Sequence, residues 1–170
     1  MLCVIAPFSL PVLAIPFSLA SLAILAVSAL LGAVRGVLAV VLYLLIGLAG
    51  IPVFSGFLGG VGCFVSPTGG FLLGYLPFAF VGGIGADILR SRFSKKSAFS
   101  RFTYGGLYFL FALAATALLY LCGCVHYCLT AGVSFPQSLS VCVLPFLPFD
   151  LLKCALAAME FVFLLRRFSK

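Results

Sequence analysis

Charged residues are missing from long stretches of this chain, and this pattern constrains its fold more than any other feature. Only 8% of its 170 residues are Asp, Glu, Lys or Arg, and 65% are hydrophobic. Soluble domains carry about a quarter charged residues, and disordered chains combine low hydrophobicity with high charge. Apolar stretches of about 20 residues are instead typical of membrane-spanning helices. We therefore predict an all-α integral membrane protein, with residues 1–170 forming a single transmembrane domain.

The basic residues lie between or after the apolar stretches and not along one surface. Short cytoplasmic loops of membrane proteins collect Lys and Arg, whereas nucleic acid binding needs a basic stripe on one face. We therefore expect a multi-pass protein of the cell membrane, with cytoplasmic basic loops and C-terminus and no nucleic acid partner. Nine of the ten basic residues form three such clusters: Arg35; Arg90, Arg92, Lys95, Lys96 and Arg101; and Arg166, Arg167 and Lys170.

The apolar stretches predict a bundle of six transmembrane helices. The first apolar unit, residues 1–14, is interrupted by Pro7 and Pro11 and is too short for a full span. We therefore expect the first helix to be truncated. The other five spans are expected at residues 17–32, 37–50, 71–89, 102–121 and 149–165.

The connection over residues 51–70 combines apolar side chains with an unusual density of helix breakers. It holds six Gly and two Pro, with Phe54, Phe57 and Phe64 among the glycines, so we expect no helix in it. Irregular backbone near a membrane has to be buried in protein or line a cavity, because lipid cannot satisfy its polar groups. With the Arg35 turn in the cytoplasm, this connection between the third and fourth spans lies outside. We predict that it is a loop that covers a ligand.

Two charged residues open the last predicted span. Asp150 and Lys153 are three residues apart, so one face of a helix presents both of them near the outer surface. Such groups usually face a bundle interior or a cavity and are functional. One acceptor and one cationic donor suit a small polar ligand such as a urea-like ring or a carboxylate. The alternative is a self-satisfied pair at a helix end, where the helix dipole also favours Asp150.

The other two acidic residues have less specific interpretations. Asp87 precedes Arg90 by three residues, which predicts a local ion pair at the cytoplasmic end of a helix. Glu160 lies seven residues beyond Lys153 on the same helix face. It extends the polar site or contacts a partner protein within the membrane, and the sequence does not decide between these two roles.

Cys122, Cys124, His126 and Cys128 gather at the start of an outer connection predicted over residues 122–148. Their spacing is not that of a common zinc motif, and without a C-x-x-C pair it does not support redox chemistry. Buried free cysteines usually act as small hydrophobes. We therefore expect packing cysteines and an interfacial His, with no metal and no cofactor.

The sequence also lacks the usual catalytic patterns. One His and three acidic residues leave no arguable Ser-His-Asp arrangement, and no phosphate-binding G-x-x-x-x-G-K-[ST] loop occurs. We therefore expect a protein that is not an enzyme. If it transports a solute with ATP, another subunit must hydrolyse the ATP.

Three segments of the chain carry recognisable signatures. Residues 30–75 include G-I-P-V-F at Gly50–Phe54 and S-P-T-G-G-F-L-L-G-Y at Ser66–Tyr75. Residues 146–158 read FLPFDLLKCALAA, and residues 15–25 read IPFSLASLAIL. In this order, the segments resemble the BioY family, the biotin-binding S components of energy-coupling factor (ECF) transporters, over nearly the whole chain.

The resemblance implies a six-helix membrane protein that captures biotin from outside with high affinity. It gives ligand-binding roles to the last span and to the loop before the fourth span, with Phe54, Phe57 and Phe64 as apolar walls. It also implies partners in the lipid bilayer and beneath it, namely a transmembrane T component and cytoplasmic ATPases. The substrate-binding residues assigned in this way are Asp150, Lys153, Thr68, Gly69, Gly70, Tyr75 and Phe54.

The chain departs from the family pattern at three places. Ser66 stands where the family has Gly before P-T-G-G, and Phe149 stands where Gly precedes the Asp. Phe149 adds bulk that we expect to narrow the pocket, so a different small vitamin is the first alternative ligand. Such subunits dock on the coupling module through an A-x-x-x-A patch, and only Ala6 remains near that place. A structural membrane protein without transport activity is the second alternative.

Overall fold

Runs of Leu, Ala, Val and Phe fold into helices here, because backbone polar groups in an apolar environment have to be satisfied within the segment. A computed structural model of the chain describes residues 2–7, 9–10, 17–92 and 98–168. Its elements are, in chain order, α1 (Leu2–Ile5), β1 (Ser9–Leu10), β2 (Phe17–Ser18), α2 (Ala20–Leu31), α3 (Ala33–Leu48), α4 (Gly62–Val65), α5 (Gly69–Arg92), α6 (Ala98–Ala131), α7 (Phe135–Cys142) and α8 (Leu147–Phe168).

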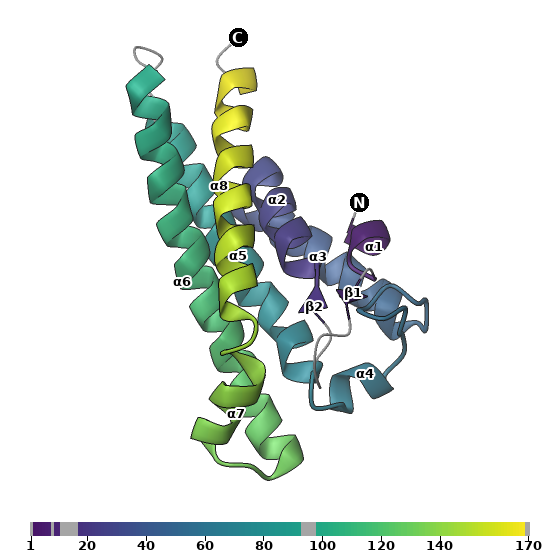
Figure 1. Cartoon of the computed structure of the whole chain (residues 1–170). Helices are drawn as coiled ribbons and strands as arrows, with labels where there is room; N and C mark the ends of the chain where they lie inside the picture. Colours follow the sequence, from purple (N-terminus) through teal and green to yellow (C-terminus); the bar gives the residue numbers. More distant parts are fainter. Residues whose placement is uncertain (1, 8, 11–16, 93–97, 169–170) are drawn as a thin grey trace.

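Helix α5 holds the bundle together. It packs against α2, α3 and α6, while α8 packs against α2 and α6. Figure 1 shows the long helices α5, α6 and α8 as one group, with the shorter pair α2 and α3 beside them. The two-residue strands β1 and β2 pair antiparallel just before α2. This arrangement brings segments from both halves of the chain to one end of the bundle.

Among the described residues, two helices are long and apolar enough to cross a membrane, over Gly69–Arg92 and Phe102–Ala131. The pair α7 and α8, bent by 60°, gives a third span if the two count as one. Helices α2 and α3 have 12 and 16 residues. At 1.5 Å per residue they are about 18 and 24 Å long, against about 30 Å of hydrocarbon. The structure is thus that of a helical membrane protein. The predicted count of six spans is larger than the two or three that pass this test among the described residues, and it stays a prediction.

Helix α6 continues to Ala131, so the predicted end of this span at residue 121 is wrong. No Pro or chain reversal interrupts the helix there, and its last turns pack under α7. The Ser138 hydroxyl of α7 donates to the Cys124 carbonyl at 3.2 Å. The predicted outer connection over residues 122–148 therefore consists largely of helix.

The prediction that residues 51–70 contain no helix is also wrong, since α4 forms one turn there. The Ser66 hydroxyl closes this turn by donating to the Cys63 carbonyl at 2.7 Å. Of the predicted first unit, residues 1–14, the four residues of α1 are helical. Residues 1, 8 and 11–14 of that unit lie outside the described residues.

The turn between α2 and α3 is held by two charged residues of α5. Gly32 has a positive φ of 84° in this turn, and a Cβ there would collide with the Asp87 carboxylate. Asp87 accepts a hydrogen bond from the Ala33 backbone N–H at 2.8 Å, at the N-terminus of α3. Arg90 donates to the Ala29 carbonyl in the last turn of α2. The negative charge of Asp87 at the start of α3 and the positive charge of Arg90 at the end of α2 both complement the helix dipoles. These two residues, one helical turn apart on α5, therefore stabilise the turn between α2 and α3.

Aromatic rings fill the centre of the bundle, and apolar side chains also cover its outside. Tyr108 of α6 and Phe161 of α8 are fully buried and stack with their centroids 4.5 Å apart. The Tyr108 hydroxyl donates to the Leu25 carbonyl of α2 at 3.3 Å. Leu38 and Leu110 are more than half exposed, at 55% and 59%. An outer surface of this kind suits contact with lipid tails.

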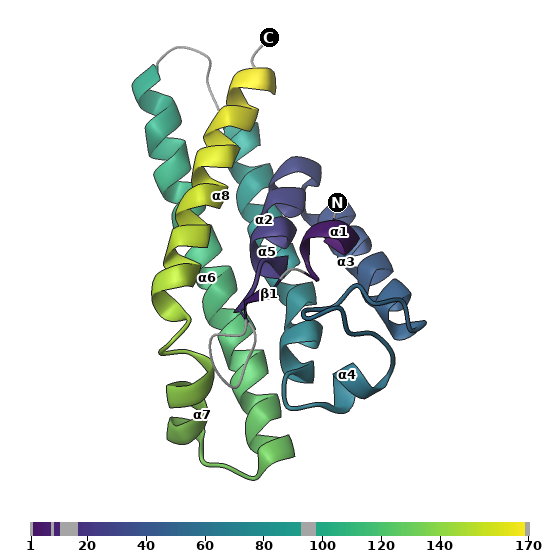
Figure 2. The ribbon, with the colours of Figure 1, turned by 45° about the vertical axis from the view of Figure 1, so that its right-hand side comes forward.

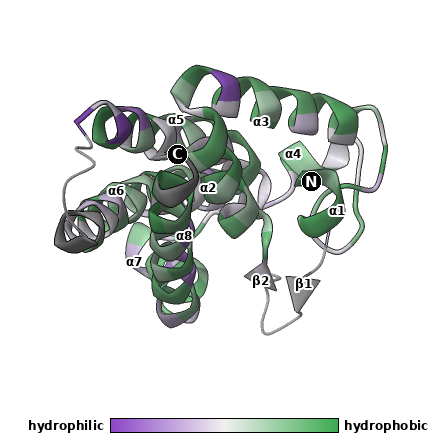
Figure 3. Ribbon diagram, turned by 90° about the horizontal axis from the view of Figure 1, so that it is seen from above, coloured by the Kyte–Doolittle hydropathy of each residue, from purple (hydrophilic) through white to green (hydrophobic). Residues whose placement is uncertain are grey.

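The helix ends that carry basic residues lie at one end of the molecule, and the short helices α4 and α7 lie at the other. The C-terminal ends of α5 and α8 share one end with the N-terminal end of α6 (Figure 1). Seen from that end, most of the ribbon is hydrophobic, with hydrophilic segments on α3 and at the end of α5 (Figure 3). Helices α4 and α7 lie at the other end (Figure 2).

Candidate ligand-binding site

A cavity of about 550 Å³ lies at the end of the bundle that carries α4 and α7. Its walls come from β2, α2, the loop after α3, and helices α4, α5, α6, α7 and α8, so both halves of the chain contribute. A polar cluster around Asp150 and Lys153 forms one part of the wall, and other hydroxyl groups together with aromatic and aliphatic side chains form the rest. The polar lining residues are Ser18, Ser21, Ser55, Ser66, Thr68, Tyr75, Tyr120, Asp150 and Lys153, and the apolar ones include Phe54, Leu58, Phe71, Leu72, Leu119 and Phe146.

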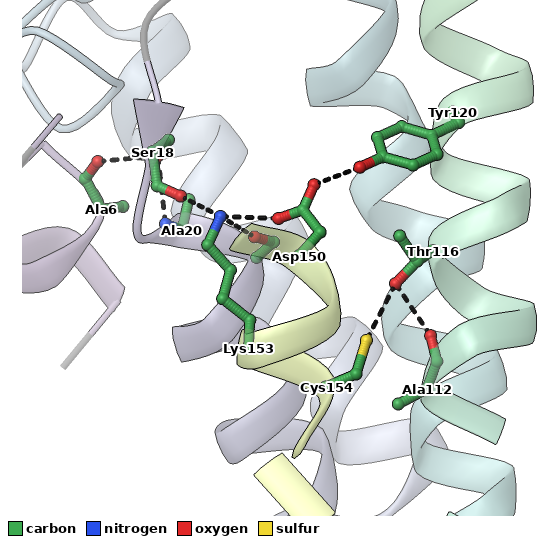
Figure 4. Close-up of polar contacts among 10 residues, drawn as sticks. Ala6, Ser18, Ala20, Ala112, Thr116, Tyr120, Asp150, Lys153 and Cys154 are labelled. Carbon is green, nitrogen blue, oxygen red and sulfur yellow. Dashed lines mark hydrogen bonds and ion pairs between the residues drawn. The ribbon is translucent and has the colours of Figure 1, made fainter. Parts of the chain in front are cut away.

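Lys153 is the centre of the polar part. Its ammonium donates to Asp150 Oδ1 at 2.8 Å, to the Ser18 carbonyl at 2.7 Å and to Ser21 Oγ at 3.0 Å (Figure 4). An ammonium has three N–H donors, so the protein supplies as many acceptors as Lys153 has donors. This full set of partners allows a charged side chain that is only 6% exposed.

Asp150 joins α8 to α6. It lies in the first turn of α8, where the helix dipole favours an anion. Its Oδ1 pairs with Lys153, and its Oδ2 accepts a hydrogen bond from the Tyr120 hydroxyl of α6 (Figure 4). Each carboxylate oxygen has two lone pairs, and these two bonds use one on each. Because Asp150 lines the cavity, it can accept further hydrogen bonds from a ligand.

The other partners of Lys153 come from the junction between β2 and α2. The Ser18 hydroxyl accepts a hydrogen bond from the Ala20 N–H at 3.0 Å at the start of α2. Ser18, Ser21 and Tyr120 were not among the site residues predicted from the sequence. The signal for Ser21 was a hydroxyl in the first turn of an apolar helix, whereas Ser18 accepts from Lys153 through its backbone carbonyl, which no side-chain pattern indicates.

Phe54 anchors the loop to α3. Its ring is 2% exposed and meets the rings of Tyr43 and Phe64 edge-on, with centroids 5.5 and 5.7 Å away. Gly47 of α3 leaves room for this ring, since a Cβ there would collide with it. The Tyr43 hydroxyl also donates to the Val53 carbonyl at 3.2 Å. These contacts fix the start of the loop and place Phe54 in the cavity wall.

Two phenylalanines of the loop do not line the cavity, contrary to the prediction. Phe57 is 60% exposed, because the loop turns sharply where Phe57 itself has a positive φ of 59°. Phe64 packs behind the ring of Phe54. Phe71 of α5 and Phe146, just before α8, take their place in the apolar wall.

The S-P-T-G-G turn divides into lining residues and packing residues. Thr68 lines the cavity, as does Tyr75 further along α5, and the Thr68 hydroxyl lies 3.0 Å from that of Ser66. Gly69 and Gly70 are not lining residues. A Cβ on Gly69 would collide with the backbone of α4, and one on Gly70 with α6. These glycines therefore bring the start of α5 against both helices.

The cysteines and the histidine near the end of α6 lie on a helix. His126 Nε2 lies 3.1 Å from the Ser66 carbonyl oxygen, and Cys124 is fully buried. In the part of the chain that the structure describes, no group of three His, Cys, Asp or Glu residues could hold a metal ion. These residues pack and connect α6, α7 and the loop.

A family model described as the BioY family matches residues 1–170. The chain belongs to the BioY family. It is 34% identical over 151 residues to a biotin transporter BioY of Thermotoga maritima, covering 89% of this chain and 81% of the relative. A biotin transporter BioY of Rhizobium etli is also 34% identical, over 158 residues that cover 90% of this chain and 79% of the relative. Because these relatives are transporters, the prediction that this BioY-family chain is not an enzyme is confirmed.

The fold of this BioY-family chain is also that of a solved structure. It matches the crystal structure of the S-component for biotin from an ECF-type ABC transporter with a TM-score of 0.75 and 23% identity. The match covers 96% of this chain and 84% of the other. At this identity, the likeness establishes the fold.

Phe149, Ala6 and Glu160, three residues that the sequence singled out in this BioY-family chain, have clear positions. Phe149 is 44% exposed and does not line the cavity, so the predicted narrowing of the pocket is wrong. It lies about 100° around the helix from Asp150. Ala6 is fully buried and offers no docking surface. Glu160 is half-buried and not a lining residue, so it does not extend the polar site, and its contact with a partner stays a prediction.

Proposed function

We propose that this chain binds biotin in the cavity and acts as the membrane-embedded S component of an ECF-type transporter for biotin uptake. Relatives that align with most of the chain are named biotin transporters, and a structure with the same fold is an S-component for biotin. The observation on this chain that carries the proposal is a charge-neutral polar cluster and apolar walls in one cavity.

Biotin has chemical groups that suit both parts of the cavity. Its ureido ring has two N–H donors and a carbonyl acceptor, and its thiophane ring and valeryl chain are apolar up to the terminal carboxylate. Asp150 and Tyr120 supply polar partners for the ureido ring, and Phe54 and Phe71 supply apolar contacts. Pockets for small ligands usually measure about 300–1,000 Å³, and the cavity of about 550 Å³ lies in that range.

The charge of the cluster favours the ureido ring at Asp150 and the carboxylate of biotin elsewhere. Asp150 and Lys153 form an ion pair with an N–O distance of 2.8 Å, so the cluster has no net charge to attract an anion. A carboxylate of the ligand beside Asp150 would add repulsion in a medium of low dielectric. We therefore assign Asp150 to the ureido N–H groups and Lys153 to holding Asp150 in place.

The remaining predicted residues take two kinds of role in this proposal. Thr68 and Tyr75 line the cavity and offer hydroxyl groups to the ligand, while Phe54 packs against its apolar part. Gly69 and Gly70 act indirectly, by allowing the start of α5 to lie close to α4 and α6.

Binding of radiolabelled biotin to the purified chain tests the proposal. We expect Asp150→Ala and Lys153→Ala each to weaken binding by about 100-fold, because truncating one partner of a buried charge pair costs about 2–5 kcal/mol. Glu160→Gln is the matched control on the same helix and should bind as wild type, since Glu160 does not line the cavity. Undiminished binding in both alanine variants would defeat the site assignment.

The orientation of biotin has its own test. Biotin amide lacks the carboxylate charge and should lose the same factor in affinity in wild type and in Asp150→Asn, if the ureido ring lies at Asp150. A loss that becomes larger in Asp150→Asn, where the repulsion from the Asp150 carboxylate is gone, would place the carboxyl end of the ligand there instead.

The two alternatives are separated by simple measurements. If another small vitamin displaces labelled biotin at a lower concentration than unlabelled biotin does, that vitamin is the preferred ligand. A purely structural membrane protein would show no thermal shift with any of these ligands, whereas a binder gains stability once the ligand exceeds its dissociation constant. Because Phe149 points away from the cavity, the reason for preferring another vitamin is removed.

We also propose a membrane arrangement and partners. Membership of the family supports a six-helix bundle in which α2, α3, α5, α6 and α8 provide five spans and the first helix, predicted over residues 1–14, is truncated. Arg35 and Arg90 are near the same end, which supports a cytoplasmic location for that end and an external one for the cavity. A transmembrane T component and cytoplasmic ATPases would energise uptake. Their co-purification with the tagged chain tests this, and a chain that purifies alone and still transports would contradict it.

A further inference from the structure

His126 connects α6 to the loop beside the cavity. Its Nε2 lies 3.1 Å from the carbonyl oxygen of Ser66, the residue that ends α4. Because a carbonyl oxygen can only accept, Nε2 is the donor in this bond. The Ser66 hydroxyl in turn contacts the Cys63 carbonyl at 2.7 Å and the Thr68 hydroxyl at 3.0 Å. The histidine thus holds a residue that organises α4 and the turn after it.

The start of α5 fits closely on α6 beside this bond. A Cβ on Gly70 would collide with the side chain of His126 and with the Cys122 carbonyl. On α6, Gly123 leaves room for the ring of Phe71, which a Cβ there would strike. The segment that follows the hydrogen bond is therefore fitted to α6 over more than one helical turn.

The loop has a separate anchor on α3. The Tyr43 hydroxyl donates to the Val53 carbonyl at 3.2 Å, and the Gly60 N–H donates to the Gly47 carbonyl at 2.7 Å. Between this anchor and His126, α4 and the turn after it form one wall of the cavity. Release of the anchor on α6 would free that wall while the anchor on α3 stays in place.

We infer that His126 is a positioning residue that holds α4 and the S-P-T-G-G turn closed over the bound ligand. It is not a lining residue itself and acts through Ser66. The kinetic part of this inference rests on the proposed biotin site. A ligand can leave when this wall moves, so loss of the bond raises the dissociation rate. The expected increase is about fivefold, the factor that corresponds to one ordinary hydrogen bond.

Three substitutions of His126 distinguish the effect of its hydrogen bond from the effect of its side-chain size. His126→Leu removes the donor, and His126→Asn keeps an amide that is too short to reach Ser66. His126→Gln carries an amide N–H at about the reach of Nε2. With the full-length chain preloaded with radiolabelled biotin, we expect His126→Leu and His126→Asn to release it about fivefold faster than wild type. His126→Gln should release it at about the wild-type rate.

A second readout needs no biotin. Cys63 lines the cavity from α4 and is half-buried, whereas Cys154 of α8 is buried. We expect a maleimide to modify Cys63 about fivefold faster in His126→Leu and His126→Asn than in wild type or His126→Gln, as followed by mass spectrometry. Modification of Cys154 should stay slow in all four proteins, because that residue reports on the bundle and not on the loop.

The outcomes are distinct. If His126→Gln behaves like His126→Asn in both readouts, or if Cys63 reacts equally in all four proteins, the inference is wrong. If wild type binds no biotin, the proposed function fails, and the reactivity of Cys63 still decides the role of His126. If His126→Leu does not fold, the Asn and Gln variants decide it, because they differ by one methylene group.

Discussion

At the scale of single residues, Lys153 carries a full charge at a position that is only 6% exposed. Its ammonium pairs with Asp150 and also donates to the oxygens of Ser18 and Ser21. Removing one partner of a buried pair leaves the other charge without compensation, whereas removing both charges can be nearly neutral. The pair should therefore be strongly coupled in stability, independently of any ligand.

We predict that Lys153→Met lowers the free energy of unfolding by about 3–5 kcal/mol, because it leaves the Asp150 carboxylate buried and uncompensated. The double variant Asp150→Asn with Lys153→Met should recover most of this loss. Unfolding in detergent without biotin is measured for wild type, for the single variants Lys153→Met and Asp150→Asn, and for the double variant. A double variant that is as unstable as the sum of the two single variants would show that the residues act independently.

Some residues of the site could be recognised from the sequence, and others could not. Asp150 and Lys153 stood out because a charge in an apolar stretch is rare. Tyr120 did not, because a tyrosine in an apolar helix usually packs, and only the folded bundle brings its hydroxyl to Asp150. Phe57 and Phe64 were given a place in the cavity wall from their position in the loop. The direction of each side chain there depends on turns that no periodic pattern encodes.

At the scale of helices, the positions of the five long helices followed from hydropathy, but their ends did not. Gly and Pro in residues 51–70 argued against a helix, yet α4 forms a turn that the Ser66 hydroxyl closes. Helix α6 runs to Ala131 because α7 packs on its last turns. Both differences arise from tertiary contacts, which override local propensity at helix ends.

The close contact between α5 and α6 depends on Gly70, which has no Cβ. Gly70→Ala should destabilise the protein by about 1–3 kcal/mol, the usual effect of overpacking, since the new methyl group would strike His126 and the Cys122 carbonyl. Gly106→Ala is the control, because no atom lies within 4 Å of a Cβ there. It should be neutral or stabilising by up to about 1 kcal/mol through helix propensity. Thermal unfolding in detergent checks both, and equal effects at the two positions would refute the argument.

At the scale of the whole molecule, the charge pattern and the cavity define two different ends. Arg35 is exposed at the start of α3, near the end of α5 that carries Arg90. The cavity, α4 and α7 lie at the opposite end (Figure 2). A chain that captures a solute outside and passes it inward needs this separation. In the proposed orientation, the positive-inside rule places the end with Arg35 and Arg90 in the cytoplasm.

This orientation is tested by cysteines placed at the two ends. In a chain whose native cysteines are replaced by alanine, Gln137→Cys on α7 should react with a membrane-impermeant maleimide added to intact cells, because Gln137 is exposed at the cavity end. Arg35→Cys, also at an exposed position, should react only after the membrane is permeabilised. Because both sites are exposed, a difference between them reports the side of the membrane and not burial. The reverse pattern would place the cavity in the cytoplasm and exclude uptake from outside through it.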